Sequence, residues 1–150
     1  MQIAAPVNNS GPIDVHVSVA IERLINIDMK NSRYSAIINV VSTWRDPEAR
    51  KSAIQDTAAA LNGTKECSTT CTAQSYRGSA CCDNVFVPYF YFGNEYSSSE
   101  LQSRIAFGDA DEMIKIVKVK GDFYQRIVMG SYPFGTTQLV AQVLLIAYAR

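Results

Sequence analysis

Two runs near the start of the chain alternate apolar and polar residues, and this alternation constrains the fold more than any other feature. Residues 15–21 carry an apolar side chain at every second position, and residues 34–44 are rich in isoleucine and valine. A period of two places successive side chains on opposite faces of a β-strand. The polar stretch at residues 28–32 separates the two runs, so together they predict a long hairpin. The alternation breaks at Arg23-Leu24, which predicts a bulge.

Further strands are predicted downstream. They lie at residues 86–92, 104–107, 112–120, 123–129 and 139–148. The first contains a proline, which favours an edge or a strand start. The last is almost wholly apolar, which is typical of a central strand buried on both sides. Gly108-Asp109 and Gly121-Asp122 predict turns, and the serine run at residues 97–100 predicts a capped turn or a loop.

An alanine-rich stretch at residues 48–61 predicts one short helix. The Ser-, Thr- and Cys-rich residues 62–84 predict a long loop, so residues 48–84 form an insert. We expect a loose lead-in at residues 1–12 and one domain over residues 13–150. About seven short strands predict an all-β fold, a twisted immunoglobulin-like β-sandwich with one short helix in its insert. Because the chain stops just after a strand of core character, we expect a partial sandwich that continues in the intact protein.

Composition excludes several functions. The chain has 14 Lys plus Arg and 14 Asp plus Glu, so no basic surface for nucleic acid is expected. No apolar run reaches the roughly 20 residues that a membrane helix needs. The first residues lack the pattern of a secretory signal. The sequence has no Gly-rich phosphate loop and no zinc-protease or serine-hydrolase motif. We therefore expect a protein that is not an enzyme and that has no cofactor and no metal.

Four clustered cysteines have three explanations. They are Cys67, Cys71, Cys81 and Cys82. Disulfides in an oxidising compartment are favoured over free thiols or a metal site, because the vicinal pair does not match paired C-x-x-C spacing. The sequence leaves the pairing open, although a bridge between neighbours in sequence would be strained. The only histidine, His16, is expected at the surface, far from these thiols in sequence.

Several conspicuous side chains are expected to be structural. Trp44 ends an apolar strand and is expected in the core. Asp46 is expected to bond a turn or cap the helix that follows. The aromatic residues 86–92 are expected to form a buried edge strand rather than a stacking site. A solvated strand face is expected for three lysines, Lys115, Lys118 and Lys120.

A rigid corner is predicted between the last two strands. It reads Tyr132-Pro133-Phe134-Gly135. Proline fixes its own φ, glycine permits a positive φ, and the two flanking rings can pack against the strand ends. A stiff aromatic corner of this kind is suited to be a contact surface.

Three motifs in order resemble the extracellular domain of pentameric ligand-gated ion channels, the Cys-loop receptor superfamily. The opening hairpin ends in Trp44-Arg45-Asp46-Pro47, which is similar to the family's W-x-D signature. Phe86-Val87-Pro88 followed by Asn94 is similar to its W-x-P…N loop. Residues 132–135 are similar to its aromatic-Pro-Phe-Asp corner, with glycine for aspartate. The two cysteines that close the corner in eukaryotic members are replaced by Gln125 and Leu139. The chain is therefore similar to the bacterial branch.

The resemblance implies a partner set and a site. It implies a ring of five identical or homologous subunits, a membrane domain in the intact protein, and an extracellular or periplasmic location. A small molecule or ion would bind between subunits, where the positions implied are Asn39, Val41, Gly93, Asn94, Ile114 and Ile116. Gly93 stands where the family usually has an aromatic residue, so a cation–π cage is not expected there. Motion would pass through two base loops, formed by Asp28, Met29, Lys30 and Asn31 and by Tyr132, Pro133, Phe134 and Gly135.

Two other functions remain open from the sequence. A soluble, secreted β-sandwich could serve as a recognition or adhesion module with the same architecture, since a fold does not fix a function. An enzyme built on the cysteine loop would need one cysteine beside His16.

Overall fold

The computed structural model describes residues 13–73, 78–125 and 138–146. The described elements, in chain order, are β1 (Val15–Asp28), β2 (Arg33–Arg45), α1 (Ala49–Leu61), β3 (Thr70–Ala73), β4 (Gly78–Cys81), β5 (Tyr89–Phe92), β6 (Glu95–Phe107), β7 (Glu112–Tyr124) and β8 (Val143–Ile146). The predicted opening hairpin and helix are confirmed. The predicted lead-in and the corner at residues 132–135 lie outside the described residues.

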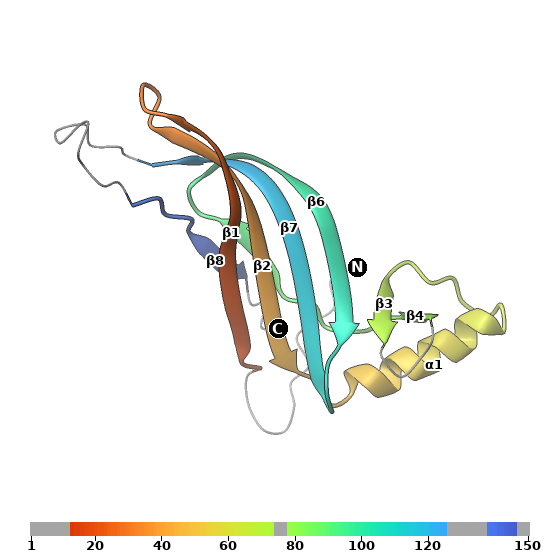
Figure 1. The fold of residues 1–150 in the computed structure, drawn as a ribbon. Coiled ribbons are helices and arrows are strands. Elements are labelled where there is room, and N and C mark those ends of the chain that lie inside the picture. The colour runs from red at the N-terminus through yellow and green to blue at the C-terminus, as the bar shows by residue number, and fades with distance from the viewer. Residues whose placement is uncertain (1–12, 74–77, 126–137, 147–150) are drawn as a thin grey trace.

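Two sheets form the layers of the sandwich. The larger has the strand order β1-β2-β7-β6-β3-β4, and the smaller pairs β5 with β8. In Figure 1 the four long strands lie side by side in a strongly curved sheet, and α1 projects from its lower end beside β3 and β4. The all-β sandwich with one helix, predicted from the sequence, is the architecture observed.

Strand β2 shows why the sequence forms this sheet. Every even-numbered residue from Tyr34 to Trp44 is buried, and the odd-numbered residues between them are only half-buried. The even-numbered side chains define the inner face of the large sheet, and the odd-numbered ones define its outer face. The predicted bulge is present, because the β1–β2 register shifts between Ile21 and Arg23 and again between Leu24 and Asn26.

Two apolar clusters occupy the inner face. The sheet cluster is formed by Tyr34, Ala36, Ile38, Val40, Phe92, Val117, Val119 and Phe123. The insert cluster is formed by Trp44, Ala49, Ala53, Cys71, Ala80, Cys82, Val85, Phe86, Phe107 and Met113. Trp44 is 2% exposed, which confirms its expected place in the core.

The predicted turn at Gly121-Asp122 is wrong, because β7 runs through it without a break. A Cβ on Gly121 would lie 2.6 Å from the ring of Phe123, so the glycine makes room for that ring. Asp122 accepts hydrogen bonds from Ser35 of β2 and Ser97 of β6, one on each side of β7. The glycine therefore serves ring packing within a strand, and the aspartate bonds to both neighbouring strands.

Three other strand predictions need correction. The serine run at residues 97–100 belongs to β6, where ladder bonds to β7 hold exposed residues in place. Only residues 89–92 of the aromatic run form a strand, which begins directly after Pro88. The predicted loop at residues 62–84 contains the β3–β4 hairpin.

The prediction of a central strand at residues 139–148 is also wrong. Within the described part of the chain, β8 covers Val143–Ile146 and pairs with β5 alone. Val140 and Leu144 are 44% and 43% exposed. Leu139, Ala141 and Val143 pack on the sheet cluster, so this segment buries one side only.

The start of α1 is fixed to the end of the large sheet. Asp46 Oδ1 accepts hydrogen bonds from the backbone N–H groups of Glu48 and Ala49, both at 3.1 Å. The Asp46 backbone N–H donates to the Asp111 carbonyl, and Arg50 donates to the Gly108 carbonyl, so the helix is tied to the β6–β7 turn. Burial raises the pKa of Asp46. The hydrogen bonds from Glu48 and Ala49 lower it, but the effect of burial is larger, so the pKa lies above its ordinary value. Of the two structural roles expected for Asp46, the structure shows the bonding of the turn that leads into α1, and Glu48 holds the N-cap position.

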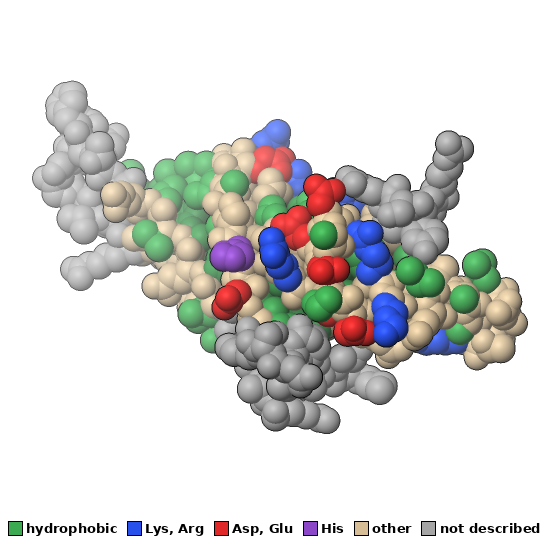
Figure 2. Space-filling view, turned by 90° about the horizontal axis from the view of Figure 1, so that it is seen from below, with side chains coloured by type: hydrophobic (Ala, Val, Ile, Leu, Met, Phe, Trp, Pro, Cys, Tyr) green, Lys and Arg blue, Asp and Glu red, His purple; other side chains and the backbone are tan. Residues whose placement is uncertain are grey.

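Charged side chains of both signs lie intermingled on the face seen in Figure 2. Within residues 13–73, 78–125 and 138–146, no helix combines the length and the hydropathy that crossing a bilayer requires.

Candidate ligand-binding face and coupling end

Four of the implied ligand-binding residues lie together on the outer face of β2 and β7. Val41 pairs with Ile116, and Asn39 and Ile114 occupy neighbouring outer positions in the same two strands. All four are half-buried. Their spacing by two residues along each strand brings them to one face. We call these four residues the outer patch.

An ion pair that the sequence did not predict borders the outer patch. The Glu22 carboxylate accepts hydrogen bonds from Lys118 Nζ at 2.6 Å and Asn39 Nδ2 at 2.9 Å. The hydrogen bond from Lys118, followed by that from Asn39, lowers the pKa of Glu22. The β1 bulge lies at Glu22, because the register shifts between Ile21 and Arg23. The broken alternation at Arg23-Leu24 is the sequence signal that could have drawn attention to Glu22. The patch thus combines aliphatic side chains with one oriented amide and one fixed charge pair.

Gly93 and Asn94 lie elsewhere and act as a clamp. Asn94 Nδ2 donates to the carbonyls of Tyr124 and Val140, and its Oδ1 accepts the Gln142 N–H. The Gly93 N–H donates to the Gln142 carbonyl at 2.7 Å, and a Cβ on Gly93 would lie 3.0 Å from the Leu144 side chain. The β5–β6 turn is therefore tied to the end of β7 and to the start of β8.

The first implied base loop is the β1–β2 turn. Asp28 accepts hydrogen bonds from the side chain and backbone of Asn31, and those two bonds, in that order, lower the pKa of Asp28. Ser32 follows with φ 51°, and Met29 is 42% exposed. The turn is closed by its own polar side chains and presents a methionine outward.

The second implied base loop, residues 132–135, lies outside the described residues, but its flanks are described. The Gln125 N–H donates to the Ser32 carbonyl at 2.9 Å, which places the end of β7 beside the β1–β2 turn. The Val140 N–H donates to Gln125 Oε1, and the Tyr34 hydroxyl donates to the Val140 carbonyl. The two chain ends that flank the corner therefore meet beside the first base loop.

A stacked arginine lies at the same end. The guanidinium carbon of Arg33 lies 3.7 Å from the ring centroid of Tyr96 and 5.1 Å from that of Tyr124. Arg33 is the first residue of β2, and no motif or spacing in the sequence marks it as a site residue.

The cysteines form two disulfides, as favoured from the sequence. Cys67 is bridged to Cys81, and Cys71 to Cys82. These bridges join the two sides of the β3–β4 hairpin. The Asp83 carboxylate lies within 4.8 Å of the Cys67 and Cys81 sulfur atoms. Those sulfurs are bonded to each other, so they are not the thiolates that a metal would bind.

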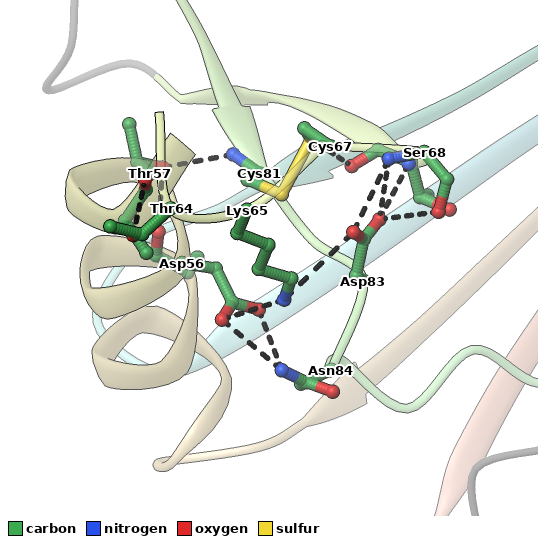
Figure 3. A network of polar contacts seen from close by, with 12 residues as sticks. Asp56, Thr57, Thr64, Lys65, Cys67, Ser68, Cys81, Asp83 and Asn84 are labelled. Atoms are coloured by element: carbon green, nitrogen blue, oxygen red, sulfur yellow. Dashed lines mark hydrogen bonds and ion pairs between the residues drawn. A yellow bond between two sulfur atoms is a disulfide. The ribbon is translucent and has the colours of Figure 1, made fainter. Parts of the chain in front are cut away.

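Polar contacts join the hairpin to α1 (Figure 3). Lys65 forms an ion pair with Asp56 at 2.8 Å, and Thr57 Oγ1 accepts the Cys81 N–H. Asp83 accepts hydrogen bonds from the N–H groups of Ser68 and Thr69. Burial by itself raises the pKa of Asp83, but these hydrogen bonds outweigh it and leave the pKa lowered.

The three predicted surface lysines do not share one face. Lys118 and Lys120 are outer-face residues of β7, whereas Lys115 lies on the inner face between Met113 and Val117. The expectation of one solvated lysine face is therefore wrong for Lys115. Residues two apart in a strand share a face, so the apolar Met113 and Val117 on either side of Lys115 are the sequence signal that could have placed Lys115 on the inner face.

No protein-family model and no curated protein matches this sequence. A solved structure does match the fold, that of AChBP from Bulinus truncatus, described as revealing the conserved structural scaffold and sites of variation in nicotinic acetylcholine receptors. The TM-score is 0.55 at 12% sequence identity, over 84% of this chain and 54% of that one. The two chains share a fold. This chain spans about half the length of AChBP, and identity this low shows the architecture alone.

Proposed function

We propose that this chain is the extracellular ligand-binding domain of a pentameric ligand-gated ion channel, of the bacterial type that lacks the Cys-loop cysteines. The observation that carries the proposal is the outer patch within a fold shared with AChBP. The family resemblance implies Asn39, Val41, Ile114 and Ile116 as ligand-binding positions, and these four residues are neighbours on one face.

In this proposal the outer patch is one side of a ligand site between identical subunits. The β5–β6 turn with Gly93 and Asn94 belongs to the other side, contributed by the neighbouring subunit. The ligand is a small molecule or ion, and the Glu22–Lys118 ion pair places two fixed charges beside the patch. Ligand binding would therefore require the assembled ring, because each site is shared by two subunits, and it would involve no catalytic step.

Coupling to the pore would run through the base of the sandwich. The β1–β2 turn at residues 28–31 and the corner at residues 132–135 would press on a membrane domain of the intact protein. The bonds of Gln125 to Ser32 and Val140 support this, because they hold the flanks of the corner to the turn. The two disulfides support an extracellular or periplasmic location.

Methyl NMR of the full chain tests the ligand site directly. With labelled isoleucine methyl groups, choline, glycine and Ca²⁺ are titrated in turn as probes of three ligand classes. The proposal predicts that a bound probe shifts the methyl signals of Ile114 and Ile116 in a saturable way. Ile54, exposed on α1, is the internal control. Saturable shifts confined to residues away from the outer patch would contradict the proposal.

The second candidate is a secreted recognition or adhesion module without channel activity. The observation that favours it is the insert, in which two disulfides and a polar network hold α1 and a hairpin rigidly beside the sandwich. A rigid projection of this kind is suited to protein contact. In the titration, this candidate predicts no response at the outer patch to any probe.

A further inference from the structure

Lys115 is a cation on the apolar face of the large sheet. Its neighbours in β7 on that face, Met113 and Val117, are 0% and 2% exposed. Across the strands it pairs with Ser42 of β2 and Ile105 of β6. Lys115 therefore lies where the two apolar clusters meet, half-buried.

The surroundings of this ammonium group leave its charge unmatched. Nζ donates one hydrogen bond, to the neutral Pro88 carbonyl at 3.4 Å, and lies 5.1 Å and 5.8 Å from the ring centroids of Tyr89 and Phe90. None of the four ion pairs among the described residues includes Lys115. Burial lowers the pKa of Lys115, and the charge of Glu100 opposes this effect only in part. Aromatic rings stabilise a cation far less than a bonded carboxylate does.

Two buried polar groups beside Lys115 have no hydrogen-bond partner in the described part of the chain. Ser42, its direct cross-strand partner, is 1% exposed, and its hydroxyl has no hydrogen-bond partner among the described residues. Trp44, two residues along the same face, is 2% exposed, and its indole Nε1 likewise has no partner among the residues that the structure describes. Buried polar groups are nearly always bonded. The ammonium, the hydroxyl and the indole N–H are all donors, so they share a need for an acceptor.

The site can be reached from the β6 side. By register, Ser103 lies opposite Val117 and Glu100 opposite Val119, so both belong to the inner face. Both are exposed, although Val117 and Val119 are buried. The small sheet therefore leaves the β6 edge of the inner face uncovered, and solutes can approach Lys115 there.

We propose that Lys115 and Ser42 bind a small carboxylate anion between the two sheets, with the Trp44 indole as a neighbouring donor. One lysine matches a monoanion, whereas a phosphate dianion would be under-neutralised and repelled by Glu100. A carboxylate has two acceptor oxygens, so it can bond the ammonium and the hydroxyl at once. Its alkyl part would pack on Ile105 and on the rings of Tyr89 and Phe90. This site lies on the opposite face of the sheet from the outer patch and is independent of it.

Trp44 is the only tryptophan of the chain, so it gives a single indole N–H signal that reports on this place. The full 150-residue chain is titrated with sodium acetate, and separately with sodium chloride, at constant ionic strength. We expect acetate to shift the indole signal in a saturable way and chloride not to. Lys115→Met should abolish the shift. Lys120→Met, on the outer face of the same strand, should leave it unchanged.

Two further variants separate binding from a structural role. Ser42→Ala should weaken acetate binding roughly tenfold, because a hydrogen bond to a charged group is lost. Without acetate the same variant should keep or raise the Tm, because it removes an unpaired buried hydroxyl. Glu100→Gln should tighten binding by removing a like charge.

Clear results would overturn the proposal. An acetate shift that persists in Lys115→Met would place the anion elsewhere. The absence of a saturable shift would remove the site. Saturation by chloride but not by acetate would contradict the carboxylate class. If Lys115→Met does not fold, Ser42→Ala decides the matter, since equal acetate affinity in this variant and in the wild type would refute the proposal.

Discussion

The two apolar clusters of the inner face are held together in different ways. In the sheet cluster, large rings contact one another: Tyr34 stacks on Phe123 with centroids 5.3 Å apart, and Phe92 meets Phe123 edge-on at 5.1 Å. In the insert cluster, Trp44 meets Phe86 edge-on at 6.3 Å, but α1 and the hairpin contribute only small side chains such as Ala49, Ala53 and Ala80, and two disulfides cross the same region. Ring packing therefore stabilises the sheet cluster, whereas in the insert two covalent bridges supplement the packing of small side chains.

Removal of both bridges should have the largest effect and should stay local. With all four cysteines changed to alanine, the insert should lose about 3 kcal/mol per bridge, given sequence separations of 14 and 11 residues. Hydrogen exchange should accelerate in α1, β3 and β4 and stay slow in β2 and β7. Equal loss of protection in β2 and β7 would show that the two regions are one cooperative unit.

Phe123→Ala, in contrast, should destabilise the whole sheet and not the insert alone. It removes the ring that contacts both Tyr34 and Phe92, and we expect a loss of roughly 3–5 kcal/mol in the free energy of unfolding, measured with urea. Tyr124→Ala, at the next residue on the other face, is the matched control and should cost about 1 kcal/mol. Similar losses in the two variants would refute the role given to the Phe123 ring.

Gly121→Ala tests whether β7 needs a glycine beside the Phe123 ring. An added Cβ would lie 2.6 Å from the Phe123 ring, so the ring must move. We expect a loss of roughly 1–3 kcal/mol, as for other overpacked positions. Gly63→Ala is an unsuitable control because Gly63 has φ 69°, whereas Ser98→Ala, opposite Gly121 in β6, is suitable. An unchanged free energy of unfolding would mean that this glycine is not needed for ring packing.

Low pH should destabilise the sheet and the insert independently, and these changes in stability should be the smallest of those predicted here. Hydrogen bonds from Ser35 and then Ser97 lower the pKa of Asp122, and the pKa of Asp83 is also lowered. A carboxyl whose folded pKa is below its ordinary value of 3.8 stabilises the fold above that pH, and this stability is lost as the pH falls through the folded pKa. Asp122→Asn should flatten the acid dependence of sheet stability, and Asp83→Asn that of insert protection. Identical acid profiles for both variants and the wild type would contradict the linkage.

Sequence reasoning succeeded where side-chain burial is periodic. In β2 each second residue is buried, so its extent could be predicted to within a residue. Sequence reasoning failed where backbone hydrogen bonds alone define a strand. Residues 97–100 are exposed serines and a glutamate, and only their ladder with β7 makes them part of a strand. Such bonds leave no pattern in the side chains.

The candidate site was predictable only where it depends on the alternation of side chains along a strand. The four residues of the outer patch follow from strand parity, so placing two strands correctly brings them together. The Glu22–Lys118 pair joins residues 96 positions apart, across a bulge whose effect on side-chain direction cannot be derived from the sequence. The unmatched charge of Lys115 likewise appears only once the second layer is in place.

The central claim is that the outer face of the large sheet is a contact face between subunits of a ring. The most direct measurement is the mass of the full chain by native mass spectrometry over a range of concentrations, for wild type and for Ile116→Asp. The account predicts a wild-type species of five chains that Ile116→Asp dissociates, while Ile54→Asp on α1 leaves it intact. A wild-type chain that stays monomeric at every concentration, or a pentamer that Ile116→Asp does not disturb, would contradict it.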